Sequence, residues 1–315
     1  MRATWPLAIA THAECGGHEP FPGHPERPAR LGAALAGAEG LGGEALAVQV
    51  DEDAVLRAIA AVHDERFPRR LRAACEGAPT VFDSPDNPVS AGTYRAALAA
   101  AACSLAAVGA AASGSASRVW VPVRPPGHHA LRDRAMGFCF FNNAAVAAEA
   151  LLARGIGPVA IVDFDVHHGN GTQAHFWDRD DAYFLSVHRY PFYPGTGGGD
   201  EVGSGRGLGF TRNFPLVAGA GDATFCGAVE AGLSEIVSAV TPAAWVVSAG
   251  FDAHRDDPLG GMSVTDEGFA AIGRLLCDVA AKTPIVAVLE GGYDLKALSR
   301  SVQSFLSTLA GAVYS

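Results

Sequence analysis

Two carboxylates and a histidine alternate along one stretch of the chain, at Asp163, Asp165 and His167. They follow the apolar, β-branched run 159–162, which predicts a buried strand. An extended backbone would turn all three side chains to one side. Burying them there is costly without a cation or hydrogen-bonding partners, and carboxylate and imidazole groups are ligands that catalytic zinc accepts. The stretch therefore indicates half of a metal centre, with a solvated turn as the alternative.

A third carboxylate, Asp252, follows another apolar run at 244–248. In open α/β sheets, ligands bind beyond the carboxyl ends of the strands. Asp252 therefore supplies the further metal ligand that the first stretch lacks. Such oxygen and nitrogen donors suit several divalent ions, zinc among them.

Two adjacent histidines, His128 and His129, follow the short β-branched run 118–123 in the segment RPPGHHA. Imidazole titrates near neutral pH, so histidines held by prolines at a strand end suit general acid–base catalysis. A surface turn is the alternative. Phenylalanines follow at 138–141, and they form either core or a wall beside a pocket.

The elements that must position these residues alternate along the chain. Apolar runs at 5–11, 118–123, 159–162, 182–187, 244–248 and 285–289 predict strands, and patterns of 12 to 18 residues between them predict helices. The proline-marked segment 82–88 predicts a loop. Arg30, before a helix predicted from Leu31, is either a buried anchor or anion binder, or part of ordinary helix-start packing. The alternation predicts an α/β fold with a mostly parallel sheet flanked by helices on both faces, as one domain over residues 1–315.

Composition limits the classes of partner. The chain has 315 residues, 49% hydrophobic residues and a net charge of −10, which argues against nucleic-acid binding. The acidic surface either steers a cationic substrate or only maintains solubility. We expect no membrane-spanning segment and no signal peptide. Six scattered cysteines without a CxxC pair predict reduced thiols and a cytoplasmic location. Alanine richness with only two lysines resembles a bacterial, GC-rich coding background.

Five motifs occur in order, RPPGHHA, MGFCFFNN, DFDVHHGNGTQ, SAGFDAHRDDPLGG and EGGYD. Together they resemble the histone deacetylase and acetylpolyamine amidohydrolase superfamily, from about His24 to Asp294. The motifs are most similar to the class II branch and its bacterial relatives. The resemblance implies a single-domain open arginase/deacetylase fold. It also implies amide hydrolysis by metal-activated water, with one catalytic zinc ion bound by Asp165, His167 and Asp252.

The resemblance also implies roles for other residues. The catalytic residues are His128, the general base His129, the oxyanion-stabilising Tyr293, and Asp163 and Asn170, which orient the two histidines. Asn170 stands where some relatives have aspartate, so the pKa of His129 should be lower than in those relatives. The implied ligands of a structural potassium ion are Asp163, Asp165, His167, Ser186 and Val187. The implied substrate-binding residues are Phe138, Tyr193, Asp83, Gly137, Leu259 and Gly291.

Two of these positions bear on the substrate. Leu259 stands where polyamine-selective relatives carry glutamate, and Asp83 matches a rim aspartate that holds the backbone of a peptide substrate. Both favour removal of an acetyl or other short acyl group from acyl-lysine in a peptide or protein. One alternative is a deacetylase of acetylpolyamines or another small N-acetylated amine. Another is a non-catalytic acyl-lysine-binding regulatory module, which needs neither a base nor an oxyanion donor. A homo-oligomer is compatible with either.

Overall fold

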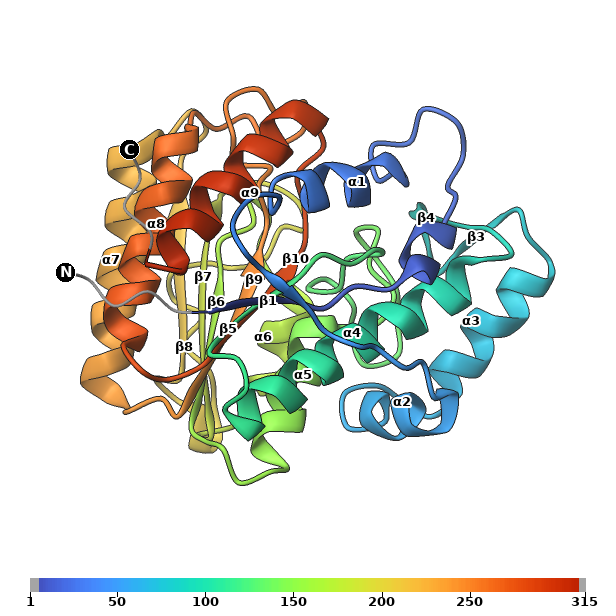
Figure 1. Ribbon diagram of the computed structural model, residues 1–315, viewed down its shortest axis with the longest axis horizontal. Helices are drawn as coiled ribbons and strands as arrows, with labels where there is room; N and C mark the ends of the chain where they lie inside the picture. The colour runs from blue at the N-terminus through green and yellow to red at the C-terminus, as the bar shows by residue number, and fades with distance from the viewer. Residues whose placement is uncertain (1–5, 312–315) are drawn as a thin grey trace.

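The computed structural model describes residues 6–311 and contains an eight-stranded sheet between two layers of helices (Figure 1). The strand order is β2-β1-β5-β10-β9-β6-β7-β8, and every neighbouring pair is parallel. The strands are β1 (Leu7–Ile9), β2 (Glu44–Ala45), β5 (Arg118–Val121), β6 (Val159–Asp163), β7 (Ala182–Arg189), β8 (Thr211–Leu216), β9 (Ala244–Ala249) and β10 (Ile285–Leu289). The predicted α/β class and parallel sheet are confirmed. Trp5, at the start of the predicted first strand, lies outside the described residues.

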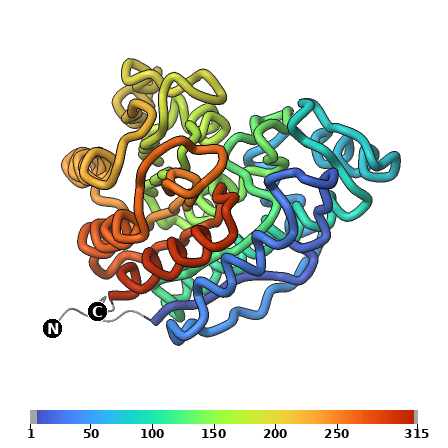
Figure 2. Tube along the Cα trace, turned by 90° about the horizontal axis from the view of Figure 1, so that it is seen from above, coloured from blue at the N-terminus to red at the C-terminus, as the bar shows by residue number. Residues whose placement is uncertain are grey.

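The helices form two layers, one on each face of the sheet (Figure 1). One layer contains α1 (Ala29–Ala36), α7 (Asp222–Ala239), α8 (Asp266–Ala280) and α9 (Leu295–Leu309), and α1 packs beside α9 (Figure 2). The other contains α2 (Glu52–Ile59), α3 (Arg66–Glu76), α4 (Thr93–Ser113), α5 (Asn143–Leu152) and α6 (Asn170–Phe176). Two short 3₁₀ helices are η1 (Ala13–Gly17) and η2 (Gly205–Gly207). Because both faces are covered, the central strands β6, β9 and β10 are buried along their whole length.

Helix α4 corrects the expectation that no segment is long and apolar enough to span a membrane. It has 21 residues, and its most apolar window has a mean hydropathy of 1.8. The mean is this high because alanine, an apolar residue on the hydropathy scale, fills much of the helix. Within the protein, 72% of the window is buried. A mostly buried core helix passes the same test of length and composition.

The segment predicted as the loop 82–88 is instead an antiparallel hairpin of β3 (Thr80–Phe82) and β4 (Ser84–Val89). Its two prolines are tolerated because a two-stranded ribbon has free edges that need no N–H donor. Asp83 forms the turn between the strands, with a φ of 61°. The prediction of a loop at 82–88, which rested on the two prolines, was therefore wrong.

The central motif leaves the sheet earlier than expected. Strand β6 ends at Asp163, so Asp165 and His167 lie in the following loop and not on an extended strand. Hydrogen bonds fold this loop: Asp163 Oδ1 accepts from the Asp165 N–H, and Asp165 Oδ1 accepts from the His167 N–H. Helix lengths also vary more than predicted, from 7 residues in α6 to 21 in α4.

Candidate active site

The three residues expected to bind metal, Asp165, His167 and Asp252, lie together beyond the carboxyl ends of β6 and β9. Their ligand atoms are all within 4.8 Å of one another. His167 Nδ1 is 3.0 Å from Asp165 Oδ1 and 3.2 Å from Asp252 Oδ2. The parallel sheet brings the two separate stretches of sequence to this point, because β6 and β9 are neighbours in register.

This donor set fits a divalent cation. Asp252 Oδ2 is buried without a hydrogen bond of acceptable geometry. Burial and the adjacent charge of Asp165 raise the pKa of the Asp252 carboxyl group. A cation between the two carboxylates would offset both their desolvation and their mutual repulsion. Two carboxylates and one imidazole also match the ligand types of catalytic zinc sites.

Two glycines allow the backbone to approach these carboxylates closely. A Cβ atom at Gly291 would lie 2.0 Å from Asp252 Oδ2 and 2.6 Å from Asp165 Oδ2. One at Gly250 would lie 2.1 Å from Asp165 Oδ2. The Gly291 N–H also donates a hydrogen bond of 2.8 Å to Asp165 Oδ2. Gly291, expected to contact substrate, is therefore placed behind the metal ligands.

Replacing Gly291 by alanine should reduce zinc affinity by about 10- to 100-fold, the range typical for disturbing groups that orient metal ligands. The added methyl group would push Asp252 and Asp165 out of position. Isothermal titration calorimetry would measure the change. Gly109→Ala in α4 is a matched control, because its Cβ would meet no atom within 4 Å and zinc affinity should be unchanged. Equal affinity in wild type and Gly291→Ala would contradict this close packing.

The adjacent histidines each bond a different partner. His128 Nδ1 lies 2.9 Å from Asp163 Oδ2, and His129 Nδ1 lies 2.7 Å from Asn170 Oδ1. Their ring centroids are 4.0 Å apart, and both rings are buried. Asp163 ends β6 and Asn170 begins α6, so the two partners come from opposite ends of one short loop.

Their environments shift the two pKa values in opposite directions. Burial favours a neutral His128 ring, but the charges of Asp163 and Asp165 outweigh burial and raise the pKa of His128 well above its ordinary value. Burial, with the positive charges of His128 and His167, lowers the pKa of His129 well below its ordinary value. These opposite shifts favour a neutral His129 ring and a protonated His128 ring at neutral pH.

A cavity of about 410 Å³ opens over this cluster. It is lined by Ser84, Pro85, Asp86, His129, Gly137, Phe138, His167, Tyr193, Leu259 and Tyr293. Four of the expected substrate-binding residues are among them: Gly137, Phe138, Tyr193 and Leu259. The same cavity is also lined by His129 of the histidine pair, by His167 of the Asp165 cluster and by Tyr293.

The Gly137-Phe138 wall adopts an unusual backbone conformation. The φ angles are 57° at Gly137 and 67° at Phe138. A side chain at position 137 would collide with His129, since its Cβ would lie 2.2 Å from His129 Cδ2. Hydrogen bonds from both N–H groups, to Asp86 Oδ2 at 2.9 Å and Asn87 Oδ1 at 3.0 Å, hold the strained turn. Strain of this kind persists where the surroundings fix it, commonly at functional sites.

Tyr293 is held at the cavity wall by groups on both sides. Its N–H donates to Asp257 Oδ2 at 2.6 Å, and its ring packs edge-on against Phe138 with centroids 5.9 Å apart. The Arg30 guanidinium lies 4.8 Å from the ring centroid. Burial raises the pKa of Tyr293 well above its ordinary value, although the Arg30 charge opposes this shift. The hydroxyl therefore stays protonated and available as a donor.

Arg30 is a buried anchor, one of the two alternatives that the sequence left open. Its Nε donates to the Gly292 carbonyl at 2.6 Å and its Nη2 to the Glu290 carbonyl at 2.5 Å. Its Nη1 lies 3.0 Å from Glu26 Oε1. The buried Glu26 carboxylate also pairs with Arg124, which precedes the histidine segment. One carboxylate thus connects the tyrosine segment and the histidine segment.

Asp83 lies close to the cavity but its carboxylate has internal partners. Oδ1 pairs with Arg70, and Oδ2 accepts from the Ala135 N–H at 3.0 Å. Asp86, three residues later, is the carboxylate that lines the cavity. It accepts hydrogen bonds from Gly137 N–H and, at 3.1 Å, from the Tyr193 hydroxyl. The peptide-binding role expected of Asp83 stays a prediction.

The residues implied to bind potassium lie on neighbouring strands. Asp163 on β6 is paired in register with Ser186 on β7, directly before Val187. The Ser186 hydroxyl is 2.9 Å from His188 Nδ1. Asp165 and His167 follow in the loop after β6, so the five implied residues lie in one region that includes two members of the Asp165 cluster. Potassium binding itself stays a prediction.

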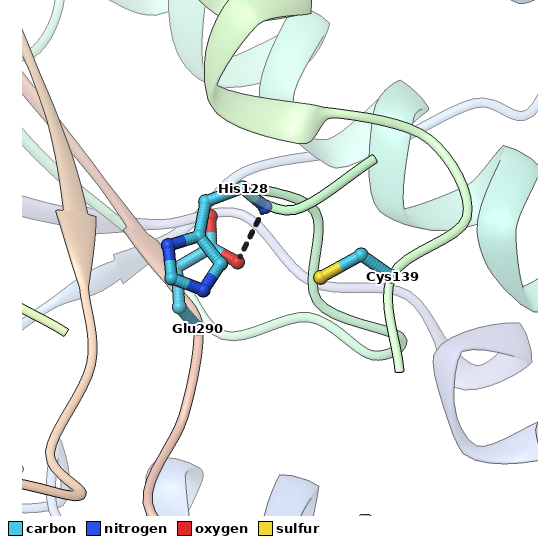
Figure 3. Close-up of side chains that lie close together, drawn as sticks. All are labelled: His128, Cys139 and Glu290. Carbon is cyan, nitrogen blue, oxygen red and sulfur yellow. Dashed lines mark hydrogen bonds between the residues drawn. The ribbon is translucent and has the colours of Figure 1, made fainter. Parts of the chain in front are cut away.

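A second group of metal-type side chains, His128, Cys139 and Glu290, lies beside the first (Figure 3). Glu290 Oε2 already accepts hydrogen bonds from the N–H groups of Gly127 at 2.7 Å and His128 at 3.1 Å. The Cys139 thiol donates to the Gly137 carbonyl. Burial and the Glu290 charge raise the pKa of Cys139 well above its ordinary value, so it stays a neutral thiol. This group therefore braces the histidine segment, and the cluster of Asp165, His167 and Asp252 is the one whose donors fit a divalent cation.

Comparisons with known proteins agree with this geometry. A family model described as the histone deacetylase domain matches residues 24–309. An acetylpolyamine amidohydrolase of Burkholderia pseudomallei is 42% identical, over 76% of this chain and 70% of that protein. Histone deacetylase 15 of Arabidopsis thaliana is 46% identical, over 60% of this chain and 35% of that protein. The crystal structure of the HDA15 HD domain covers 99% of this chain and 90% of its own, with a TM-score of 0.88 and 33% identity. The chain therefore belongs to the histone deacetylase domain family.

Proposed function

We propose that this protein is a metal-dependent deacetylase that removes an acetyl or other short acyl group from acyl-lysine in peptides or proteins. One observation carries the proposal: His129, His167 and Tyr293 line the same cavity. A general base, a metal ligand and a hydroxyl donor thereby reach one small volume, as amide hydrolysis requires. A non-catalytic binding module would need no such set.

The residues of the site divide the chemistry between them. A divalent ion held by Asp165, His167 and Asp252, which we propose to be zinc, would supply Lewis acidity at the amide carbonyl and acidify the attacking water. His129 has Nδ1 bonded to Asn170, which leaves Nε2 to accept the water proton and to return it to the leaving amine. His128, held charged by Asp163, adds electrostatic stabilisation, and the Tyr293 hydroxyl donates to the developing oxyanion.

Replacing Asn170 by aspartate should shift the acid limb of the kcat/KM pH profile to higher pH. His129 must be neutral to accept a proton, so activity rises with pH through its pKa. That pKa is lowered in this protein. A negative charge bonded to Nδ1 would stabilise the imidazolium and raise the pKa. A pH–rate profile of both proteins would measure the shift, and an acid limb that stays in place would contradict the role of His129.

Acyl-lysine is favoured over acetylpolyamines by the cavity wall. An elongated polyamine carries further ammonium groups, which need acidic partners. Asp86 is the one acidic residue among the described residues that line the cavity, and both its oxygens accept hydrogen bonds, from Ser84, Gly137 and Tyr193. Leu259 offers no charge. A deacetylase of acetylpolyamines remains the second candidate, because the net charge is −10 and two relatives are acetylpolyamine amidohydrolases.

Steady-state turnover of an acetyl-lysine peptide and of N-acetylputrescine, side by side, tests the substrate. We expect kcat/KM to favour the peptide by more than about tenfold, because the lining lacks a free carboxylate for the ammonium group of the diamine. A preference of similar size for the acetylated diamine would overturn the peptide assignment while leaving the chemistry in place.

The proposal includes the remaining expectations from the sequence. These are a structural potassium ion beside Asp163 and Ser186, one catalytic domain over residues 1–315, and a cytoplasmic location without nucleic-acid or membrane partners. The location is supported by the six cysteines, all of which are free thiols.

A further inference from the structure

Aromatic side chains from the loop after β7 hold the imidazole of His167. The Phe192 ring stacks on it, with centroids 5.2 Å apart and planes inclined by 15°. The Tyr193 ring meets it edge-on, with centroids 6.1 Å apart and planes inclined by 82°. Tyr193 lines the catalytic cavity, whereas Phe192 is half-buried and does not. Phe192 therefore contacts this metal ligand without forming part of the cavity wall.

Arg189, at the end of β7, holds Phe192 in turn. Its guanidinium carbon lies 4.0 Å from the centroid of the Phe192 ring, close enough for a cation–π contact. Its Nη1 donates a hydrogen bond of 3.2 Å to the Gly260 carbonyl. A Cβ atom at Gly261, where φ is 61°, would lie 2.7 Å from the same nitrogen. Glycine at this position therefore leaves the space that the guanidinium occupies.

Arg189 also joins the two segments of sequence that carry the metal ligands. Its N–H donates a hydrogen bond of 2.9 Å to the carbonyl of Val166, the residue between the first two ligands. Its guanidinium binds Gly260, whose Cβ atom, if present, would lie 1.8 Å from the carbonyl oxygen of Asp252. The turn at Gly260 thus packs directly on the backbone of the third ligand. One arginine is thereby connected to both sides of the metal cluster.

A histidine ligand needs a contact that fixes the plane of its ring. Rotation about the Cβ–Cγ bond of histidine has broad energy wells, so the backbone alone does not set where a ring nitrogen points. Most metal-binding histidines donate the second ring N–H to an acceptor, and this hydrogen bond orients the ring. In residues 6–311, the His167 ring forms hydrogen bonds only through Nδ1, which faces Asp165 and Asp252. Ring contacts are therefore what fixes its plane.

We propose that Phe192 and Arg189 are positioning residues for the metal centre. The Phe192 ring fixes the plane of His167, and Arg189 fixes the Phe192 ring against both ligand-bearing segments. Neither side chain lines the catalytic cavity, so both act through His167 and not on the substrate. The proposal rests on the proposed function, because it takes the cluster of Asp165, His167 and Asp252 as the site of the catalytic ion.

Zinc affinity of the whole chain, measured by isothermal titration calorimetry, tests this role. Phe192→Leu keeps an apolar side chain but removes the flat ring, and it should lower zinc affinity by about 10- to 100-fold. Phe192→Tyr keeps the ring and should bind zinc as wild type does. Arg189→Met removes the cation–π contact and the bond to Gly260, and it should lower zinc affinity in the same direction.

Phe214→Leu is the matched control. Arg212 lies over Phe214 on β8 as Arg189 lies over Phe192, with its guanidinium carbon 4.8 Å from the ring centroid, and both phenylalanines are half-buried. Among the described residues, Phe214 makes no ring contact with His167. Its replacement should lower the Tm of the metal-free protein about as much as Phe192→Leu does, but leave zinc affinity unchanged.

Cobalt(II) accepts the same ligand types as zinc, and its visible absorption spectrum reports the geometry of the ligands. The spectrum should change in Phe192→Leu and Arg189→Met but not in Phe214→Leu, whereas a merely structural role of Phe192 would alter only the Tm. Wild-type zinc affinity and an unchanged cobalt spectrum in Phe192→Leu would overturn the proposal, as would an equal loss of zinc affinity in Phe214→Leu. If Phe192→Leu does not fold, wild-type zinc affinity in Arg189→Met has the same meaning.

Failure of the proposed function would give a different result. Wild type that binds zinc but hydrolyses neither an acetyl-lysine peptide nor N-acetylputrescine would contradict the deacetylase, and the zinc affinities would still decide the roles of Phe192 and Arg189. Wild type that binds no zinc would contradict both.

Discussion

Replacing Tyr293 by phenylalanine is expected to lower kcat by about 100- to 1,000-fold, the usual cost of removing one oxyanion donor. The substitution removes only the hydroxyl. Contacts of the ring with Phe138 and Arg30, and the backbone bond to Asp257, would remain. KM should change little, because the hydrogen bond strengthens as negative charge develops on the carbonyl oxygen.

The matched control is Tyr190→Phe, since Tyr190 is exposed and does not line the catalytic cavity. Zinc affinity, measured by calorimetry, should be equal in wild type and both variants. Turnover of Tyr293→Phe within a factor of about three of wild type would exclude Tyr293 as the oxyanion donor, given the size expected for that bond.

Replacing Asp252 by asparagine is expected to abolish stable zinc binding and to lower kcat by at least about 1,000-fold, because several kcal/mol of transition-state stabilisation are attributed to a catalytic metal. The effect on the metal-free protein has the opposite sign. The pKa of Asp252 is raised in the folded protein, so its ionised form destabilises the fold at pH values above its unfolded pKa. Metal-free Asp252→Asn should therefore be at least as stable as metal-free wild type at neutral pH.

Thermal unfolding with and without zinc measures both effects. Wild type should gain in Tm on zinc addition, and Asp252→Asn should not. Asp180→Asn, an exposed aspartate on the surface, is the control and should behave as wild type. A zinc-dependent rise in Tm that persists in Asp252→Asn would remove Asp252 from the metal site.

The sequence predicted six strands of the main sheet, the central ones among them, because the central strands are covered on both faces. It missed the two edge strands β2 and β8. The apolar runs of the central strands are continuous, and Ile285–Leu289 was delimited correctly. The hairpin of β3 and β4 was missed because its prolines signal a loop, and only its pairing outside the main sheet tolerates them. The end of β6 was misplaced because alternation of polar residues continues past Asp163, where hydrogen bonds and not strand pairing set the geometry.

The candidate site was predictable where residues follow strand ends. His129, Asp252 and Tyr293 follow three neighbouring parallel strands, β5, β9 and β10, whose carboxyl ends share one edge of the sheet. The role of Tyr293 was implied only by the family resemblance. Residues that act through distant partners were missed. Glu26 and Asp257 form their bonds with Arg124 and Tyr293, far along the chain, and nothing in the local sequence specifies these pairs.

Glu290 was also missed, although a signal for it existed. It follows an apolar strand directly, as Asp163 ends one, and its carboxylate binds the backbone of the histidine segment. Asp86 was not singled out from the sequence, although it lines the cavity and Asp83 does not. The contribution of Glu290 depends on backbone N–H groups that its position in the sequence does not reveal.

The most direct test of a metal-dependent deacetylase is acetate release from an acetyl-lysine peptide by one preparation in three states: as purified, after removal of metal by a chelator, and after addition of one equivalent of zinc. Activity should fall to background on chelation and return with zinc, while Asp252→Asn stays at background throughout. Hydrolysis that continues undiminished in the chelated protein, with metal content verified as negligible, would contradict the account.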